Sequence, residues 1–188
     1  MQRLCIYCGS NSGFDPAFQA AAVAMGRLCA RSGIGIVYGG GSVGLMGLVA
    51  DAALAEGGEV IGVIPKLLVE HEKEHRSLTR LIEVATMHER KQTMADLADA
   101  FLALPGGIGT LEELVEVMTW QQLGYHQKAV GVLNISGFFT PLLDLLSHME
   151  NRGFLRKENR EDLLVGTTPE VVLEALSSFQ PRNCPKWI

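Results

Sequence analysis

Residues 100–113 read AFLALPGGIGTLEE, and this stretch decides the fold class. The apolar run at 100–104 is typical of a buried strand, and an amphipathic helix begins a few residues later. Gly106, Gly107 and Gly109 let the intervening backbone approach a ligand closely. The free N–H groups and positive dipole end of the helix attract an anion. We therefore predict that this loop holds a phosphate group.

Glu113 lies one helical turn further on, and phosphate binding alone does not require it. A phosphate directly beside this carboxylate would repel it, so we expect Glu113 to face a sugar or its glycosidic carbon. A second interpretation stays open. Thr110 and Glu113 also have the spacing of a capping box, in which both side chains bond to N–H groups at the helix start.

Two further strand-like runs end in glycine. The segment GGGSVGLMG at 39–47 follows an apolar run at 34–38, and the first run, 3–8, ends in Gly9 and Ser10. The carboxyl ends of parallel strands meet at one edge of a sheet, where α/β proteins bind ligands. We therefore expect these turns and the 105–113 loop to build one site.

Apolar runs of strand length alternate with segments of helical period, which predicts an α/β fold with a mainly parallel sheet. Residues 65–80 are polar and predict a loop or short helix beside the site. Residues 1–180 are expected to form one domain with an irregular tail at 181–188. The predicted strands are 3–8, 34–38, 59–64, 81–85, 100–104, 129–133 and 163–165, with Gly33, Gly57, Gly58 and Gly124 at helix ends.

Composition excludes several classes of partner. The 188 residues are 47% hydrophobic with a net charge of -5, which argues against binding to nucleic acid or to an anionic membrane. Four cysteines outside any short secreted framework favour reduced thiols, and no signal peptide or membrane span is evident. We therefore expect a cytoplasmic protein.

Three other motifs lack the context that their chemistry needs. Residues 39–44 match GxGxxG, but the acid expected about 20 residues later for a dinucleotide ribose is missing. Residues 71–75 match HExxH within a wholly polar run, without the apolar helix face that fixes zinc ligands. Cys5 and Cys8 lie inside a strand instead of at a helix N-terminus. We therefore expect neither a metal nor a cofactor.

Residues 86–92 read TMHERKQ and place two cations where a helix start normally prefers acids. In one interpretation Thr86 and Glu89 form a capping box and both cations are solvated. In the other, Arg90 projects toward the 105–110 loop, where its fork of donors suits a phosphate or the Glu113 carboxylate.

Over residues 3–175 the sequence resembles the LOG family of cytokinin riboside 5′-monophosphate phosphoribohydrolases. The motifs that carry the resemblance are YCGS at 7–10, GGGSVGLMG at 39–47, MHERK at 87–91, PGGIGTLEE at 105–113 and TWQQLG at 119–124. The resemblance implies a Rossmann-like, doubly wound sheet with helices on both faces, and a homodimer. It also implies hydrolysis of AMP or a cytokinin ribotide to a free adenine-type base and ribose 5-phosphate.

The resemblance further implies that Arg90 and Glu113 are the catalytic pair. The residues that it and the glycine turns assign to nucleotide binding are Gly9, Ser10, Gly40, Gly41, Glu72, Met87, Lys91, Gly106, Gly107, Ile108, Gly109, Thr110 and Thr119. The acid that protonates the leaving base is not identified, and Glu72 is one candidate. An alternative is a nucleotide sensor or carrier that does not cleave its ligand. Similar sequences have been labelled lysine decarboxylases, but we find no recognisable lysine site for pyridoxal phosphate.

The helix at 111–123 carries more apolar residues than one side of a sheet requires. Either this helix is buried on two sides, or part of its apolar face contacts a second copy of the chain. We expect the dimer contact.

Overall fold

The computed structural model describes residues 1–69, 75 and 77–182, without the side chains of residues 68 and 69. Its sheet has seven parallel strands in the order β4-β3-β2-β1-β5-β6-β7. The strands are β1 (Arg3–Tyr7), β2 (Gly35–Tyr38), β3 (Val60–Pro65), β4 (Arg80–Val84), β5 (Ala100–Ala103), β6 (Ala129–Leu133) and β7 (Leu163–Gly166). Every predicted strand is confirmed, with ends that differ by one residue at most.

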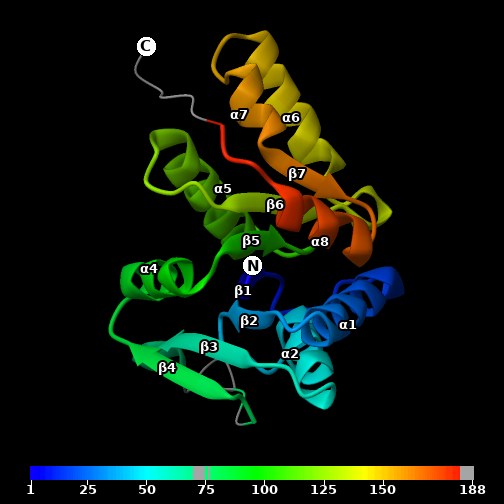
Figure 1. Ribbon diagram of the computed structural model, residues 1–188, viewed down its shortest axis with the longest axis vertical. Helices are drawn as coiled ribbons and strands as arrows, with labels where there is room; N and C mark the ends of the chain where they lie inside the picture. The colour runs from blue at the N-terminus through cyan, green and yellow to red at the C-terminus, as the bar shows by residue number, and fades with distance from the viewer. Residues whose placement is uncertain (70–74, 76, 183–188) are drawn as a thin grey trace.

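Helices cover both faces of this sheet, as expected for a doubly wound fold (Figure 1). One face carries α1 (Pro16–Arg31), α2 (Gly44–Ala55) and α8 (Pro169–Ser178), and the other carries α4 (Met87–Leu97), α5 (Ile108–Leu123) and α6 (Thr140–Asn151). Shorter elements are α3 (Lys66–Val69), the 3-10 turn η1 (Ile135–Gly137) and α7 (Lys157–Glu161). The sheet thus separates two apolar cores.

Strand order reverses between β1 and β5. From β1 the chain adds β2, β3 and β4 outward on one side, and it then returns to place β5 on the other side. The turns after β1 and β5 are neighbours, because these two strands pair directly and in parallel. From these turns the chain leads away in opposite directions along the sheet. Such a reversal leaves a crevice at the carboxyl edge of the sheet, where ligands of this fold class bind.

Glycine ends several helices as predicted. Gly124 follows α5 in the left-handed conformation with a φ of 80°. Gly33 and Gly57 follow α1 and α2 with φ values of 68° and 76°. A glycine adopts these angles without the steric cost that a β-carbon would add.

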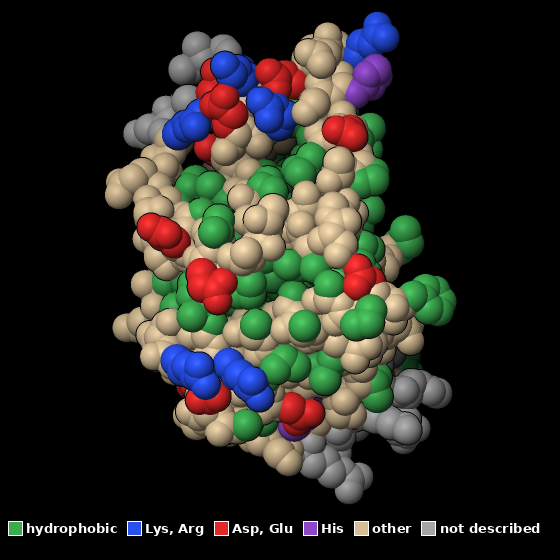
Figure 2. Space-filling view, turned by 90° about the vertical axis from the view of Figure 1, so that its right-hand side faces the viewer, with side chains coloured by type: hydrophobic (Ala, Val, Ile, Leu, Met, Phe, Trp, Pro, Cys, Tyr) green, Lys and Arg blue, Asp and Glu red, His purple; other side chains and the backbone are tan. Residues whose placement is uncertain are grey.

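The segment after β3 begins with the short helix α3, which agrees with the expected loop or short helix at 65–80. Residues 70–74 and 76 lie outside the described part of the chain. No helix among the described residues is long and apolar enough to cross a membrane. On the face shown in Figure 2, Lys and Arg side chains lie beside Asp and Glu side chains and form no large patch of positive charge.

Gly26 brings α1 and α2 close together. A β-carbon at this position would lie 2.3 Å from the backbone oxygen of Val49 and 3.0 Å from the Ala52 side chain. The first contact is with backbone, which cannot rotate away. The spacing of these two helices therefore depends on a residue without a side chain.

We predict that Gly26→Ala destabilises the protein by about 1–3 kcal/mol through overpacking, although alanine favours a helix by about 1 kcal/mol. Urea unfolding measures the change. Ala24→Gly, at an exposed position of the same helix, reports the propensity effect alone. A Gly26→Ala variant more stable than the natural chain would contradict the close packing of these helices.

Candidate functional site

The backbone of Gly9 joins three turns at the carboxyl edge of the sheet. Its N–H donates to the Pro105 carbonyl at 3.1 Å, and its carbonyl accepts from the Leu45 N–H, at the start of α2, at 3.0 Å. A β-carbon on Gly44 would lie 2.3 Å from the Ser10 backbone, and one on Gly9 would lie 3.2 Å from the Gly106 Cα. The predicted convergence of the three turns is therefore confirmed.

The N-terminus of α5 is open at this edge. Its N-cap residue is Gly107, which has no side chain to bond to the first N–H groups. Gly107, Ile108 and Gly109 are exposed. The first-turn amides of a helix have no partners within the helix, so they and the dipole are available to an anion.

Thr110 is not the cap of this helix. It is the third helical residue, it is buried, and its hydroxyl packs against Gly106, where a β-carbon would lie 2.1 Å from the Thr110 Oγ1. The capping-box interpretation of Thr110 and Glu113 is therefore wrong, because the helix begins three residues earlier than that box requires. Glu113 is left to another role.

Arg90 is buried at the carboxyl ends of β2 and β3. Its Nε donates to the Val63 carbonyl at 3.1 Å, and its Nη2 donates to the Gly39 carbonyl at 2.9 Å. We expected Arg90 to project toward the 105–110 loop, but these bonds direct the guanidinium toward the glycine turn after β2. Thr86 caps α4 as one interpretation proposed, but Arg90 is not solvated as that interpretation required.

Gly39 is the residue that makes this placement possible. A β-carbon there would lie 2.1 Å from the Arg90 Nη2. The binding residues predicted from sequence include Gly40 and Gly41 but not Gly39, although the run of three glycines at 39–41 is a signal for it.

Glu113 is half-buried on α5. Burial raises the pKa of the Cys8 thiol, and the negative charge of Glu113 raises it further. The pKa of the Cys5 thiol is likewise raised by burial and by Glu113, whereas the positive charge of Arg90 lowers it. The charges of Arg90 and Glu113 thus both act on Cys5 in β1.

Lys91 is also withdrawn from solvent, with 11% of its side chain exposed. Its Nζ lies 2.5 Å from Glu112 Oε1 and 3.0 Å from Glu116 Oε1, both on α5. Burial lowers the pKa of Lys91, but the bonds to the two carboxylates raise it more, so the pKa is raised overall. The ammonium therefore stays charged between α4 and α5.

His75 links the turn after β2 to helix α2. The His75 backbone N–H donates to the Gly40 carbonyl at 3.1 Å, and its Nε2 lies 2.9 Å from Asp51 Oδ1 on α2. The Ser77 N–H donates to Nδ1 at 3.3 Å, so Nε2 carries the proton that bonds to Asp51. Sequence reasoning missed this contact, because His75 stands out only within the HExxH match.

The remaining predicted binding residues are distributed around this edge. Ser10 and Met87 are exposed, and Gly40, with a φ of 81°, and Gly41 are buried. The Met87 sulfur lies 3.9 Å from the Arg90 Nη1. Glu72 and His71 lie outside the described residues. Among the residues that are described, no three His, Cys, Asp or Glu side chains are grouped to hold a metal.

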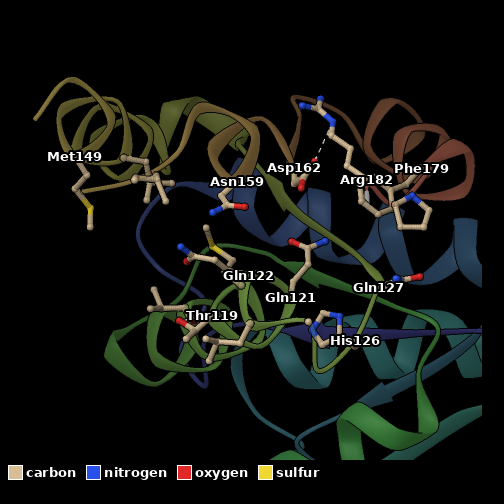
Figure 3. Close-up of a pocket in the computed structure, with 17 residues that line it drawn as sticks. Thr119, Gln121, Gln122, His126, Gln127, Met149, Asn159, Asp162, Phe179 and Arg182 are labelled. Carbon is tan, nitrogen blue, oxygen red and sulfur yellow. Dashed lines mark hydrogen bonds and ion pairs between the residues drawn. The ribbon is translucent and has the colours of Figure 1, made fainter. Parts of the chain in front are cut away.

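Thr119 lies in a different place. It lines a pocket of 330 Å³ between α5, α6 and α7, together with Gln122, His126 and Asp162, as Figure 3 shows. Its hydroxyl donates to the Val115 carbonyl at 2.7 Å. Thr119 lies six positions after Glu113 on α5, a distance of about 9 Å along the helix axis. One chain therefore does not bring Thr119 to the glycine turns.

Comparison with known proteins gives close relatives over nearly the whole chain. A family model described as "Possible lysine decarboxylase" matches residues 46–176. The chain is 46% identical to the cytokinin riboside 5′-monophosphate phosphoribohydrolase LOG of Oryza sativa subsp. japonica, over 96% of this chain and 75% of that protein. It is 44% identical to the phosphoribohydrolase LOG7 of Arabidopsis thaliana, over 96% of this chain and 83% of that one.

Solved structures with the same fold are more distant in sequence. A molybdenum cofactor binding protein from Rippkaea orientalis superposes with a TM-score of 0.70 at 21% identity, over 95% of this chain and 97% of that one. The Moco carrier protein of Chlamydomonas reinhardtii gives 0.72 at 17% identity, over 94% and 95%. At this identity the likeness shows the fold alone.

We predict that Gly39→Ala displaces the Arg90 guanidinium and leaves the fold intact. The methyl group would meet the end of a flexible side chain, so the cost is the lost hydrogen bonds, about 1.5–3 kcal/mol. A crystal structure of the variant checks the position of Arg90. Gly107→Ala is the control, because its β-carbon would meet nothing within 4 Å. An unmoved Arg90 in Gly39→Ala would show that Gly39 is not required.

Proposed function

The chain belongs to the LOG family, and we propose that it hydrolyses the N-glycosidic bond of a nucleoside 5′-monophosphate, releasing an adenine-type base and ribose 5-phosphate. The observation that carries this proposal is the pairing of an open helix N-terminus with a carboxylate one turn further along the same helix. The first suits the phosphate of such a substrate, and the second suits its sugar.

The phosphate would lie on the amides of residues 106–110. Three features support this placement: glycine at the N-cap, exposed residues in the first turn, and no acid within that turn. Gly9 and Ser10 would border the same position, because Gly9 is bonded to Pro105 and Gly106 packs against it. An acidic chain needs such a local device to hold an anion, because its overall field repels one.

Glu113 would act at the sugar. As the bond between C1′ and the base nitrogen breaks, positive charge develops on C1′ and the ring oxygen, and a carboxylate nearby stabilises it. The same carboxylate can orient the water whose oxygen forms the new bond to C1′. The base leaves with a proton, for which Glu72 or water is the proposed source.

Arg90 would supply a positive charge at the site. Its guanidinium is fixed by two backbone carbonyls, so its direction is set before a ligand arrives. A cation there attracts the anionic substrate and favours the ionised form of a neighbouring carboxylate. AMP and cytokinin ribotides both meet these requirements, since they differ only at the base.

We predict that Glu113→Gln abolishes base release while AMP binding remains measurable by calorimetry, because the amide keeps its size but cannot stabilise positive charge. Free base is measured by chromatography after incubation with AMP and, separately, with isopentenyladenosine monophosphate. Glu174→Gln on α8 is the control and should retain full turnover. Turnover by Glu113→Gln would remove this residue from the mechanism. Binding without turnover by the natural chain would favour a sensor or carrier.

We also propose that the chain forms a homodimer through α5. Leu114 and Val117 on this helix pack against the sheet, whereas 37% of Leu111 and 44% of Val115 remain exposed. The helix is thus not covered on two sides within one chain. A second copy seated on these residues would bury the remaining apolar surface.

Light scattering tests this assembly. We expect twice the chain mass of 20.4 kDa. Val115→Glu should shift the protein toward the monomer, since it would place a charge at the proposed contact. A natural chain that scatters as a monomer would rule the dimer out.

A further inference from the structure

The contacts of Lys91 suggest a role different from phosphate binding. Lys91 directly follows Arg90 on α4, and its partner Glu112 directly precedes Glu113 on α5. The second partner, Glu116, lies one turn further along α5. The ammonium group therefore joins the immediate neighbours of the two residues proposed to act on the substrate.

The burial of Lys91 makes its ion pairs with Glu112 and Glu116 important for stability. Only 11% of the Lys91 side chain is exposed, while Glu112 and Glu116 are 53% and 23% exposed. A charge withdrawn from water to this degree needs compensating partners, and two carboxylates at 2.5 and 3.0 Å supply them. Two of the three ammonium hydrogens are thereby used.

The first three turns of α5 carry three acids, Glu112, Glu113 and Glu116. Uncompensated, Glu112 and Glu116 would repel each other across one helical turn. They would also add negative charge beside Glu113 and beside a phosphate at the helix start. Lys91 offsets one of these charges from the neighbouring helix.

We propose that Lys91 is a positioning residue. It fixes α4 against α5, and hence Arg90 relative to Glu113, and it limits the negative charge around Glu113. It acts through Glu112 and Glu116 and does not bind the phosphate. The kinetic part of this inference rests on the proposed function.

Kinetics with AMP test this role in four proteins. They are the natural chain, the single variant Lys91→Met, the double variant Glu112→Gln/Glu116→Gln, and the triple variant that carries all three substitutions. We expect Lys91→Met to lower kcat about 10-fold or more, with KM changed less than about threefold, because the loss is in alignment and not in binding. In the triple variant kcat should recover to within about threefold of the double variant, since the acids that Lys91 compensates are gone.

Lys91→Arg is the conservative variant. An arginine keeps the charge and can bond to both carboxylates, so we expect it to retain most of the turnover. A lysine that bound phosphate directly would give the opposite pattern in Lys91→Met. KM for AMP would rise about 10-fold, and the triple variant would show no recovery. That result would overturn the inference.

Urea unfolding of the same four proteins provides a readout that does not depend on turnover. The effects of removing the lysine and the two acids on the free energy of unfolding should be non-additive, because these residues interact directly. Additive effects would overturn the inference even if the natural chain is active. If the natural chain releases no base, the proposed function fails, and the unfolding cycle alone decides whether Lys91 joins the helices.

Discussion

The structure depends on the close approach of backbones around Gly9. Its N–H and carbonyl bond to the turn after β5 and to the start of α2, so one residue links elements from three parts of the chain. Side chains cannot be accommodated at this junction, because β-carbons on Gly44 and Gly106 would lie 2.3 and 2.1 Å from neighbouring atoms. The glycines therefore determine how closely the helix N-termini gather at the sheet edge.

The outline of the fold could be predicted from sequence, because its strands and turns have clear local patterns. Strands buried on both faces are continuous apolar runs, and the stretches at 34–38 and 100–104 are of that kind. Helices between these strands favour a parallel sheet. In such a sheet the glycine-rich turns that follow the strands all lie at its carboxyl edge. The convergence of the turns on a site follows from the topology, without knowledge of any side-chain contact.

Side-chain directions could not be predicted in the same way. Arg90 is turned toward Val63 and Gly39, which are 27 and 51 residues away in sequence, so helical spacing held no information about them. Thr110 matched a capping box only while the start of α5 was unknown. Thr119 matched a family motif, yet in the folded chain it lies in the pocket between α5 and α6. Long-range packing decided the direction of Arg90, and the exact start of α5 decided the role of Thr110.

Arg90 and Lys91 are adjacent in sequence and both nearly buried, yet their side chains are held by different groups. The bonds of Arg90 to Val63 and Gly39 end on backbone carbonyls, which orient the guanidinium. The bonds of Lys91 end on carboxylates, which largely cancel its charge within the protein. In a chain with a net charge of -5, an anionic substrate needs a local positive field. The open N-terminus of α5 supplies part of that field, whereas the charge of Lys91 is directed to Glu112 and Glu116.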